Sequence, residues 1–354
     1  MSVQRYRKEF KDLLEQTIIP EGCTQEELEN KLLPLVSLII KHIPAQLFKY
    51  RECSEQDFET LNENKLYASV SDKFNDPFDC LFHYDKKRIL NTILFSSTKQ
   101  YNAEIRDRLR MGEEFPPEYQ VLFPNDFLNA FKDFLINVSD EELERHEKSM
   151  IDSKSSWEKR IEKVAEEAIS GVKKLSNIAC LSEVINSVTM WSHYADSHKG
   201  FALAYDLRQF NLQEHLCEET EQDSSLLQGF LYPVIYSKQR YDATIFIDWA
   251  LGKKKNMPVL NYDLLTTVKS QLYKSLQWSY EKEWRLIISS PTVNQAKPTR
   301  CICNLSPTAI FYGARIKPIN KKILHSIAQE KGIEEYQMYI DNKSYNYSIK
   351  YKKL

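Results

Sequence analysis

The sequence predicts an α+β fold, because short apolar stretches typical of β-strands occur both before and after a long block of helical sequence. The chain has 354 residues, of which 42% are hydrophobic and 28% charged, and this composition is typical of a globular protein. Its length fits one elaborated domain or two. We expect an N-terminal helical extension over residues 1–45 and a single α+β domain over residues 46–354, with a helical insertion at about residues 86–175.

Charge and hydropathy narrow the classes of function. Lysine and arginine, with 48 residues, nearly balance aspartate and glutamate, with 50, so the net charge gives no global attraction to nucleic acid or to an anionic membrane. Any site for a polyanion must therefore be local. The longest apolar stretch, residues 32–40, contains a proline and is far shorter than the roughly 20 residues that span a bilayer. The polar N-terminus lacks the apolar core of a leader, so we expect a cytoplasmic protein without membrane contact.

The cysteines and histidines do not form a metal-binding pattern. Seven cysteines, an odd number scattered over a long chain, predict reduced thiols and no disulfide framework. Cys301 and Cys303 stand one residue apart, with no second pair or nearby histidine to complete a zinc set. His193 and His198 are five residues apart, which does not align two ligands on one helical face. We therefore expect no zinc site.

The first elements are two helical segments separated by strand signals. Thr24 and Glu27 form a capping box at the start of the N-terminal helix. Residues 47–50 are expected to form a strand, Ser54 to cap a short helix, and residues 66–70 to form a second strand. This compact unit would let its loops face one cleft.

The later elements alternate between helix and strand. Ser139 and Glu142 form a second capping box, for a long charged helix that ends near Gly171. A further helical stretch is expected at residues 262–277. Strand signals occur at residues 178–182, 200–205, 232–236, 283–289 and 309–313.

The C-terminal segment interleaves basic and aromatic residues. Its members are Lys343, Tyr345, Tyr347, Lys350, Tyr351, Lys352 and Lys353. Such a pattern can bind single-stranded nucleic acid, but it also fits a terminal strand with an exposed lysine edge. The alternation from Tyr345 to Tyr351 favours the strand.

Two glutamates near the end of the chain are the first candidates for catalysis. On a strand, Glu281 and Glu283 would share one face with Arg285, while Lys282 and Trp284 would share the other. An acid pair on one face is costly unless a cation, a ligand or water takes up the charge. The alternative is an edge strand whose charges are simply solvated.

Two other segments could contribute to a site. Residues 74–79 contain the strong turn signal Asn75-Asp76-Pro77, which together with Asp79 would suit the rigid wall of a pocket. Residues 190–200 form the densest cluster of hydrogen-bonding side chains.

On a helix in the second segment, Trp191, Tyr194 and Ala195 would share one face, and Gly200 would end the helix. His193 is a candidate catalyst because of its titration range, and the alternative is a structural histidine. The sequence contains no phosphate loop, dinucleotide fingerprint or nucleophile elbow, which argues against a P-loop ATPase, a Rossmann oxidoreductase and a serine hydrolase.

Seven segments in order resemble the bacterial domain-of-unknown-function family 2971 (DUF2971) over about Leu47 to Ile316. They are Leu47–Arg51, Phe74–Asp79, Cys180–Glu183, Met190–Ala195, Gly200–Phe201, Val234–Tyr236 and Tyr280–Arg285. The name of this family indicates no activity.

The layout is also similar, more distantly, to the ADP-ribosyltransferase superfamily, including the DarT-like toxins that modify DNA. The resemblance implies a mixed, split β-sheet core and NAD as the cofactor. By position, Arg51 would hold the phosphates of NAD and Ser69 would brace the site. Glu283, with Glu281 beside it, would stabilise the developing oxocarbenium ion or activate the acceptor. Further contacts to NAD are expected from Tyr50, Asn75, Asp76, Trp191 and Tyr194.

The expected function is therefore ADP-ribosyl transfer to a nucleic acid or protein, or NAD cleavage, in a bacterial toxin or anti-phage defence. Two alternatives stay open. The first is a metal-dependent nuclease with Asp76, Asp79, Glu281 and Glu283 around magnesium. The second is a non-enzymatic module that senses a nucleotide or peptide. The sequence does not fix the oligomeric state, and a homo-oligomer is compatible with it.

Overall fold

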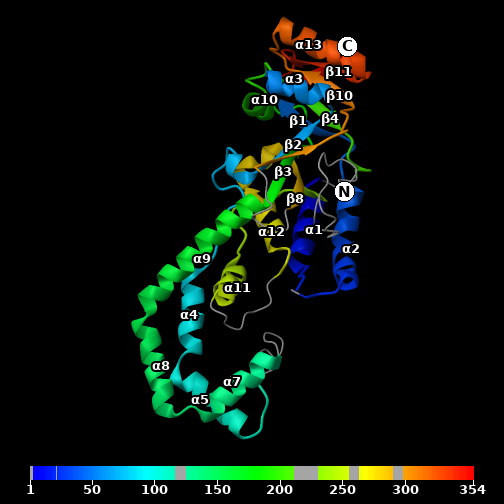
Figure 1. Ribbon diagram of the computed structural model, residues 1–354. Coiled ribbons are helices and arrows are strands. Elements are labelled where there is room, and N and C mark those ends of the chain that lie inside the picture. Colours follow the sequence, from blue (N-terminus) through cyan, green and yellow to red (C-terminus); the bar gives the residue numbers. More distant parts are fainter. Residues whose placement is uncertain (1–2, 21, 116–124, 211–229, 255–262, 290–297) are drawn as a thin grey trace.

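The fold is α+β, as expected, and consists of a mixed β-sheet, two N-terminal helices packed against it and a long helical arm (Figure 1). The computed structural model describes residues 3–20, 22–115, 125–210, 230–254, 263–289 and 298–354. Among these residues, no helix combines the length and the apolar character needed to cross a membrane.

The elements are as follows. The helices are α1 (Val3–Gln16), α2 (Gln25–His42), α3 (Glu55–Asn62), α4 (Lys86–Ser96), α5 (Lys99–Arg110), α7 (Asn125–Asn137), α8 (Asp140–Asp152), α9 (Lys154–Leu175), α10 (Val188–Tyr194), α11 (Thr244–Lys254), α12 (Thr266–Leu272) and α13 (Pro318–Lys331), with the 3₁₀ turns η1 (Ser71–Lys73) and η3 (Leu276–Glu281). The strands are β1 (Leu47–Arg51), β2 (Leu66–Val70), β3 (Ser176–Ser182), β4 (Phe201–Tyr205), β5 (Phe230–Pro233), β6 (Ile235–Ser237), β7 (Tyr273–Ser275), β8 (Glu283–Ser289), β9 (Thr299–Ile302), β10 (Ala309–Tyr312), β11 (Glu334–Ile340) and β12 (Ile349–Lys353).

The large sheet splits at β3. Its strands follow the order β12-β11-β10-β4-β1-β3-β2-β9, and β8 pairs with β3 and β5. Strand β8 occupies one edge of β3 from Ser176 to Ser182, so β1 and β2 must share the other edge. Strand β1 meets that edge only at Ser182, whereas β2 meets it at Asn177 and Ile178. Strands β1 and β2 therefore lie along the same edge of β3 without pairing with each other.

The central strands are apolar because both of their faces are covered. All five residues of β4 and six of the seven residues of β8 are buried. Gly200, just before β4, must be glycine, because a Cβ there would lie 2.0 Å from the carbonyl oxygen of Arg51. This close approach brings β4 and β1 together directly beside α10.

The N-terminal helices pack into the main core. Phe10, Leu14, Leu35 and Ile39 are almost fully buried in the same apolar cluster as Leu286 of β8. The capping box between Thr24 and Glu27 is confirmed, with the backbone N–H of Glu27 donating to Thr24 Oγ1 at 3.2 Å.

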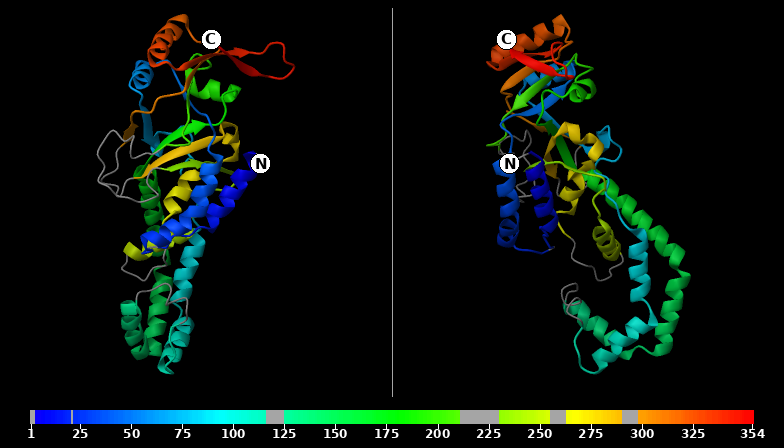
Figure 2. Two further views of the ribbon diagram at one scale, coloured as in Figure 1. Left: turned by 90° about the vertical axis from the view of Figure 1, so that its right-hand side faces the viewer. Right: turned by 180° about the vertical axis from the view of Figure 1, so that it is seen from behind.

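The expected helical block forms an arm that extends away from the sheet (Figure 2). The capping box of Ser139 and Glu142 is confirmed. The single long helix expected after it is wrong, because the chain forms two helices, α8 and α9, that meet at Ser153. Helix α9 also continues past Gly171 to Leu175, where β3 begins.

Three other expectations are corrected. The helix expected over residues 262–277 is confined to α12 in the described part of the chain, because Tyr273 and Ser275 pair in parallel with β6 and so form β7. Strand β12 begins only at Ile349, after a turn that contains the preceding tyrosines. Cys303 is disulfide-bonded, so reduced thiols are found at Cys23, Cys53, Cys80, Cys180 and Cys301 but not at every described cysteine.

Candidate active site

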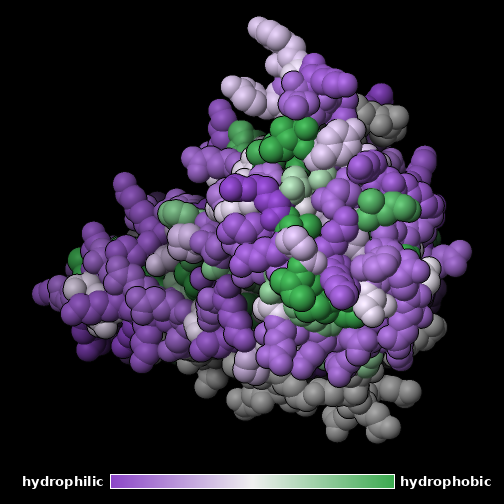
Figure 3. All heavy atoms as spheres, turned by 90° about the horizontal axis from the view of Figure 1, so that it is seen from above, coloured by the Kyte–Doolittle hydropathy of each residue, from purple (hydrophilic) through white to green (hydrophobic). Residues whose placement is uncertain are grey.

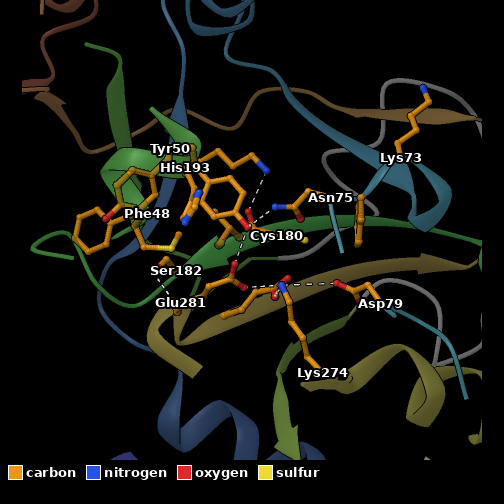
Figure 4. A pocket seen from close by; sticks show the side chains of 16 residues that line it. Phe48, Tyr50, Lys73, Asn75, Asp79, Cys180, Ser182, His193, Lys274 and Glu281 are labelled. Carbon is orange, nitrogen blue, oxygen red and sulfur yellow. Dashed lines mark hydrogen bonds and ion pairs between the residues drawn. The ribbon is translucent and has the colours of Figure 1, made fainter. Parts of the chain in front are cut away.

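A cavity of about 360 Å³ lies where the sheet splits (Figure 4). Strands β1 and β3, the segment after β2, helix α10 and the β7–η3–β8 segment all contribute to its wall. The lining residues are Phe48, Lys49, Tyr50, Lys73, Phe74, Asn75, Asp79, Cys180, Leu181, Ser182, Met190, His193, Tyr194, Lys274, Glu281 and Glu283.

The base of the cavity is a buried ion cluster around Lys274. Its Nζ lies 2.5 Å from Glu281 Oε2, 2.9 Å from Glu283 Oε2 and 3.6 Å from Asp79 Oδ2. Figure 4 shows Glu281, Lys274 and Asp79 joined in one chain of contacts. Arg285, which is fully buried, adds contacts of 2.9 Å to Glu283 Oε1 and 2.7 Å to Asp79 Oδ2. Three carboxylates thus face two cations, and one acid lacks a cation of its own.

The two glutamates differ in acidity. Burial, and then the charge of Glu283, raises the pKa of Glu281 to about 7. Burial acts in the same direction on Glu283, but the charges of Arg285 and Lys274 outweigh it and hold the pKa of Glu283 well below its usual range. We call Glu281 and Glu283 a divided glutamate pair, because their pKa values are shifted in opposite directions. Such a pair suits acid–base catalysis, because one member changes its protonation near neutral pH while the other stays ionised.

The glutamates converge for a reason that the sequence pattern did not reveal. Glu281 ends the 3₁₀ turn η3, and Lys282 has a left-handed backbone with φ of 45° before β8 starts at Glu283. The expectation that strand alternation aligns the pair is therefore wrong, although Glu283 and Arg285 do share a face. Ser182 Oγ fixes the turn by donating to the carbonyl oxygen of Glu281 at 2.6 Å.

Side chains from two distant segments complete the acidic end of the cavity. The hydroxyl of Tyr194 donates to Glu281 Oε1 at 2.6 Å, and Asn75 Nδ2 donates to the same hydroxyl at 3.1 Å. The hydroxyl of Tyr50 donates to the carbonyl oxygen of Val184 at 2.5 Å, which holds its ring against the cavity. Tyr194, itself held by Asn75, thus binds Oε1 of Glu281, whereas Lys274 binds Oε2.

Lys49 is the cation in the β1 part of the wall. Its Nζ donates to the carbonyl oxygen of Cys180 at 3.0 Å, and among the described residues it makes no ion pair. Burial, and then the charge of Arg51, lowers the pKa of Lys49. An anionic group of a ligand in the cavity would favour the charged form of Lys49, whose N–H groups not used by Cys180 could bind that group.

The structure brings together most of the site residues predicted from the sequence. The catalytic candidates Glu281, Glu283 and His193 line the cavity, and so do the NAD-contact candidates Tyr50, Asn75 and Tyr194. The histidine is exposed at the cavity wall, with its ring centroid 6.4 Å from that of Tyr280.

Four predicted cofactor residues do not line this cavity. Arg51 pairs with Asp57 at 3.5 Å, while its neighbour Lys49 reaches the cavity.

The other three lie in the surrounding framework. Ser69 opposes Ile178 within the sheet. Trp191 is fully buried and donates to the carbonyl oxygen of Ile185 at 2.7 Å. Asp76 is buried in its turn, where Oδ1 accepts from the backbone N–H of Phe78 at 2.9 Å.

Helix α10, which carries His193, ends earlier than expected. It stops at Tyr194. After Ala195, the three residues Asp196, Ser197 and His198 all have positive φ. The expectation that Gly200 ends the helix is therefore wrong. Gly200 instead closes the loop, since its N–H donates to the carbonyl oxygen of Ala195 at 2.8 Å.

The acids of the cavity do not form a magnesium site. Among the described residues, no group of three histidine, cysteine, aspartate or glutamate side chains is placed to hold a metal ion. Lys274 occupies the position between Asp79, Glu281 and Glu283 that a cation would need, and Asp76 does not join these acids. This geometry disfavours the nuclease alternative.

Part of the chain matches a known family. Residues 190–286 match the model described as "Protein of unknown function (DUF2971)". This segment contains His193, Tyr194, Lys274 and both glutamates of the cavity. No curated protein and no solved structure matches the chain. The resemblance to DUF2971 expected from the sequence is thereby confirmed over residues 190–286.

Proposed function

We propose that this protein breaks the bond between nicotinamide and ribose in NAD and transfers ADP-ribose to an acceptor, either a nucleic acid or a protein, or to water. The observation that carries the proposal is the divided glutamate pair at the start of β8, which faces a cavity at the split of the sheet. Transfer to a macromolecule would suit a toxin or an anti-phage defence enzyme, as the resemblance to ADP-ribosyltransferases implies.

The chemistry requires a carboxylate beside the ribose. When the bond from C1′ to nitrogen breaks, its electron pair leaves with nicotinamide and the ribose becomes an oxocarbenium ion. A nearby ionised carboxylate stabilises this positive charge. A lone pair of the acceptor then forms the new bond to C1′, and the acceptor's proton passes to the carboxylate.

We assign this role to Glu281. Both oxygens of Glu283 are bound by Arg285 and Lys274, so Glu283 positions the cations. Glu281 lines the cavity, and its Oε1 contacts only the hydroxyl of Tyr194 among the described residues. Its pKa of about 7 lets it accept a proton near neutral pH.

The rest of the cavity suits the remainder of NAD. Lys49, with no ion pair of its own among the described residues, would bind the pyrophosphate in place of Arg51. The rings of Phe48, Tyr50 and Tyr194 offer aromatic surface for a planar ring.

The test is incubation with NAD labelled in its adenylate half, together with single-stranded nucleic acid or a protein mixture. We expect release of nicotinamide and transfer of the label. Glu281→Gln should lower the rate roughly 100-fold or more, because Gln can neither carry the charge nor accept the proton. The exposed Glu52→Gln is the matched control and should leave the rate unchanged.

The pH profile gives a second readout. Because Glu281 must be ionised to act, nicotinamide release should rise with pH through about 7. The proposal is overturned if no acceptor gives either nicotinamide release or label transfer. Tight binding of NAD without turnover would also overturn it and would identify a nucleotide sensor instead.

A further inference from the structure

The β11–β12 hairpin projects from the end of the molecule farthest from the helical arm (Figure 2, left, red). Between Asp341 and Leu354 it contains four lysines, three tyrosines and a single acidic side chain. Tyr345 and Tyr347, in the turn, are 103% and 104% exposed. Two fully exposed tyrosine rings two residues apart, among lysines, offer flat surface and positive charge together, which is what stacking bases and their phosphates need.

The surrounding surface is not a hydrophobic docking face. Viewed from this end, the molecule is mainly hydrophilic, with separate small hydrophobic patches (Figure 3). A partner that combined flat rings with negative charge would match the hairpin better than an apolar protein surface.

One tyrosine of the hairpin is held rigidly. The ring of Tyr351 packs edge-on against Phe311, with centroids 5.2 Å apart, and against Tyr336, at 5.5 Å. Tyr351 is nevertheless 48% exposed. It therefore offers a fixed ring face, which costs little entropy when a base stacks on it.

The lysines of the hairpin are available to phosphates. Among the described residues, Lys343 and Lys352 make no ion pair. Lys350 pairs with Asp341 at 2.6 Å and Lys353 pairs with Glu334, but both lysines are more than half exposed. The pair of Lys353 with Glu334 is exposed on both sides and contributes little stability, so a phosphate can replace that carboxylate.

The hairpin and the cavity share one face of the sheet. The register places Tyr50 of β1 opposite Ala202, Ala202 opposite Phe311, Phe311 opposite Tyr336, and Tyr336 opposite Lys353 of β12. Directly opposed residues project to the same face. Four strand spacings of about 4.8 Å put the cavity-lining Tyr50 and Lys353 of the hairpin about 19 Å apart, which a few nucleotides can span.

We propose that the β11–β12 hairpin binds single-stranded nucleic acid and leads it towards the cavity, which makes nucleic acid the acceptor. Binding follows from the hairpin alone, and the acceptor role rests on the proposed function. Bases stack on Tyr345, Tyr347 and Tyr351, and the lysines contact the phosphates.

Fluorescence anisotropy tests the binding without NAD. Labelled single-stranded DNA and RNA 20-mers of mixed sequence serve as probes, with the matching DNA duplex for comparison. The whole chain should prefer the single strands. Tyr345→Ala/Tyr347→Ala should weaken binding on the order of tenfold or more, because two stacking faces are lost. Both side chains are fully exposed, so the fold should persist.

A lysine pair provides an independent readout. Lys343→Ala/Lys353→Ala, which removes one lysine of the turn and the lysine of β12 on the cavity face, should reduce the slope of log affinity against log salt by about 1.4, at roughly 0.7 for each phosphate contact to a single strand. The control Lys159→Ala/Lys163→Ala removes two exposed lysines from α9 and should leave the slope unchanged.

The outcomes separate this proposal from the function of the cavity. Equal binding by the tyrosine variant and the unmodified chain, or an equal loss in the α9 control, would overturn the hairpin as the binding surface. If the hairpin binds single strands but NAD is never cleaved, the binding inference stands and the proposed function fails. If NAD is cleaved, the tyrosine variant should still hydrolyse NAD to nicotinamide and free ADP-ribose, and it should lose label transfer to the oligonucleotide.

Discussion

Lys274 is the residue on which the charge balance of the cavity depends. Burial disfavours its charged form, but the carboxylates around it, Glu283 first, raise its pKa above the usual value. Removing the ammonium group would leave Glu281, Glu283 and Asp79 to share the single charge of Arg285 in a buried space. A broken buried pair costs far more than a broken surface pair, because the remaining charge keeps its desolvation penalty.

We therefore predict that Lys274→Met lowers the free energy of unfolding by about 3–5 kcal/mol at pH 7. The matched control is Lys65→Gln, which breaks an exposed pair with Glu63 at 2.6 Å, close to the 2.5 Å between Lys274 and Glu281. The control should cause a much smaller change. Urea denaturation of the three proteins measures the difference, and equal losses in both variants would contradict a buried, charge-dependent cluster.

Among the elements, α1 supports the site from behind. Arg7 donates to the carbonyl oxygen of Val234 at 2.7 Å, to that of Glu283 at 3.3 Å and to Glu183 Oε1 at 2.6 Å. The same carboxylate oxygen of Glu183 accepts from Tyr6 and from the indole N–H of Trp284. One arginine thus joins the N-terminal helix to the ends of β3 and β5 and to the start of β8.

We predict that Arg7→Ala destabilises the fold by roughly 2–3 kcal/mol, because it leaves Glu183 without a cation. Hydrogen exchange should become faster at the start of β8, around Glu283, since the carbonyl oxygen there loses a donor. Arg5→Ala, on the same helix but exposed, is the control and should change neither quantity. An effect confined to α1 would show that the helix does not support β8.

The sequence specifies some of these elements better than others. Both capping boxes could be read locally, since a Ser or Thr and a Glu three residues later satisfy each other whatever the tertiary fold. The position of Lys274 could not, because β7 exists only through its pairing with β6, and propensity alone favours a helix there. Alternation also could not decide between Lys49 and Arg51. The two residues are two positions apart on β1 and so project to the same face. Only the pairing of β1 with β3 at Phe48 and Ser182 determines that Lys49, and not Arg51, reaches the cavity.

At the scale of the whole molecule, the arm and the sheet have separate cores. The tip of the arm is held by its own apolar cluster, which is formed by Ile105, Leu109, Phe115, Leu128, Leu135, Val138 and Leu143. The cluster that includes β3 and β8 contains none of these residues. A small core far from the main one stabilises only the helices around it, so the tip should open without unfolding the sheet.

We predict that Leu135→Ala and Leu286→Ala, two substitutions of leucines that are 1% and 0% exposed, act on different parts of the molecule. Each removes about 2–5 kcal/mol of local packing energy. Leu135→Ala should speed hydrogen exchange in α5, α7 and α8 and leave β3 and β8 protected. Leu286→Ala should instead speed hydrogen exchange across the sheet, including the strands that line the cavity. Peptide-resolved hydrogen exchange compares the two. Loss of sheet protection in Leu135→Ala equal to that in Leu286→Ala would mean that arm and sheet unfold as one cooperative unit.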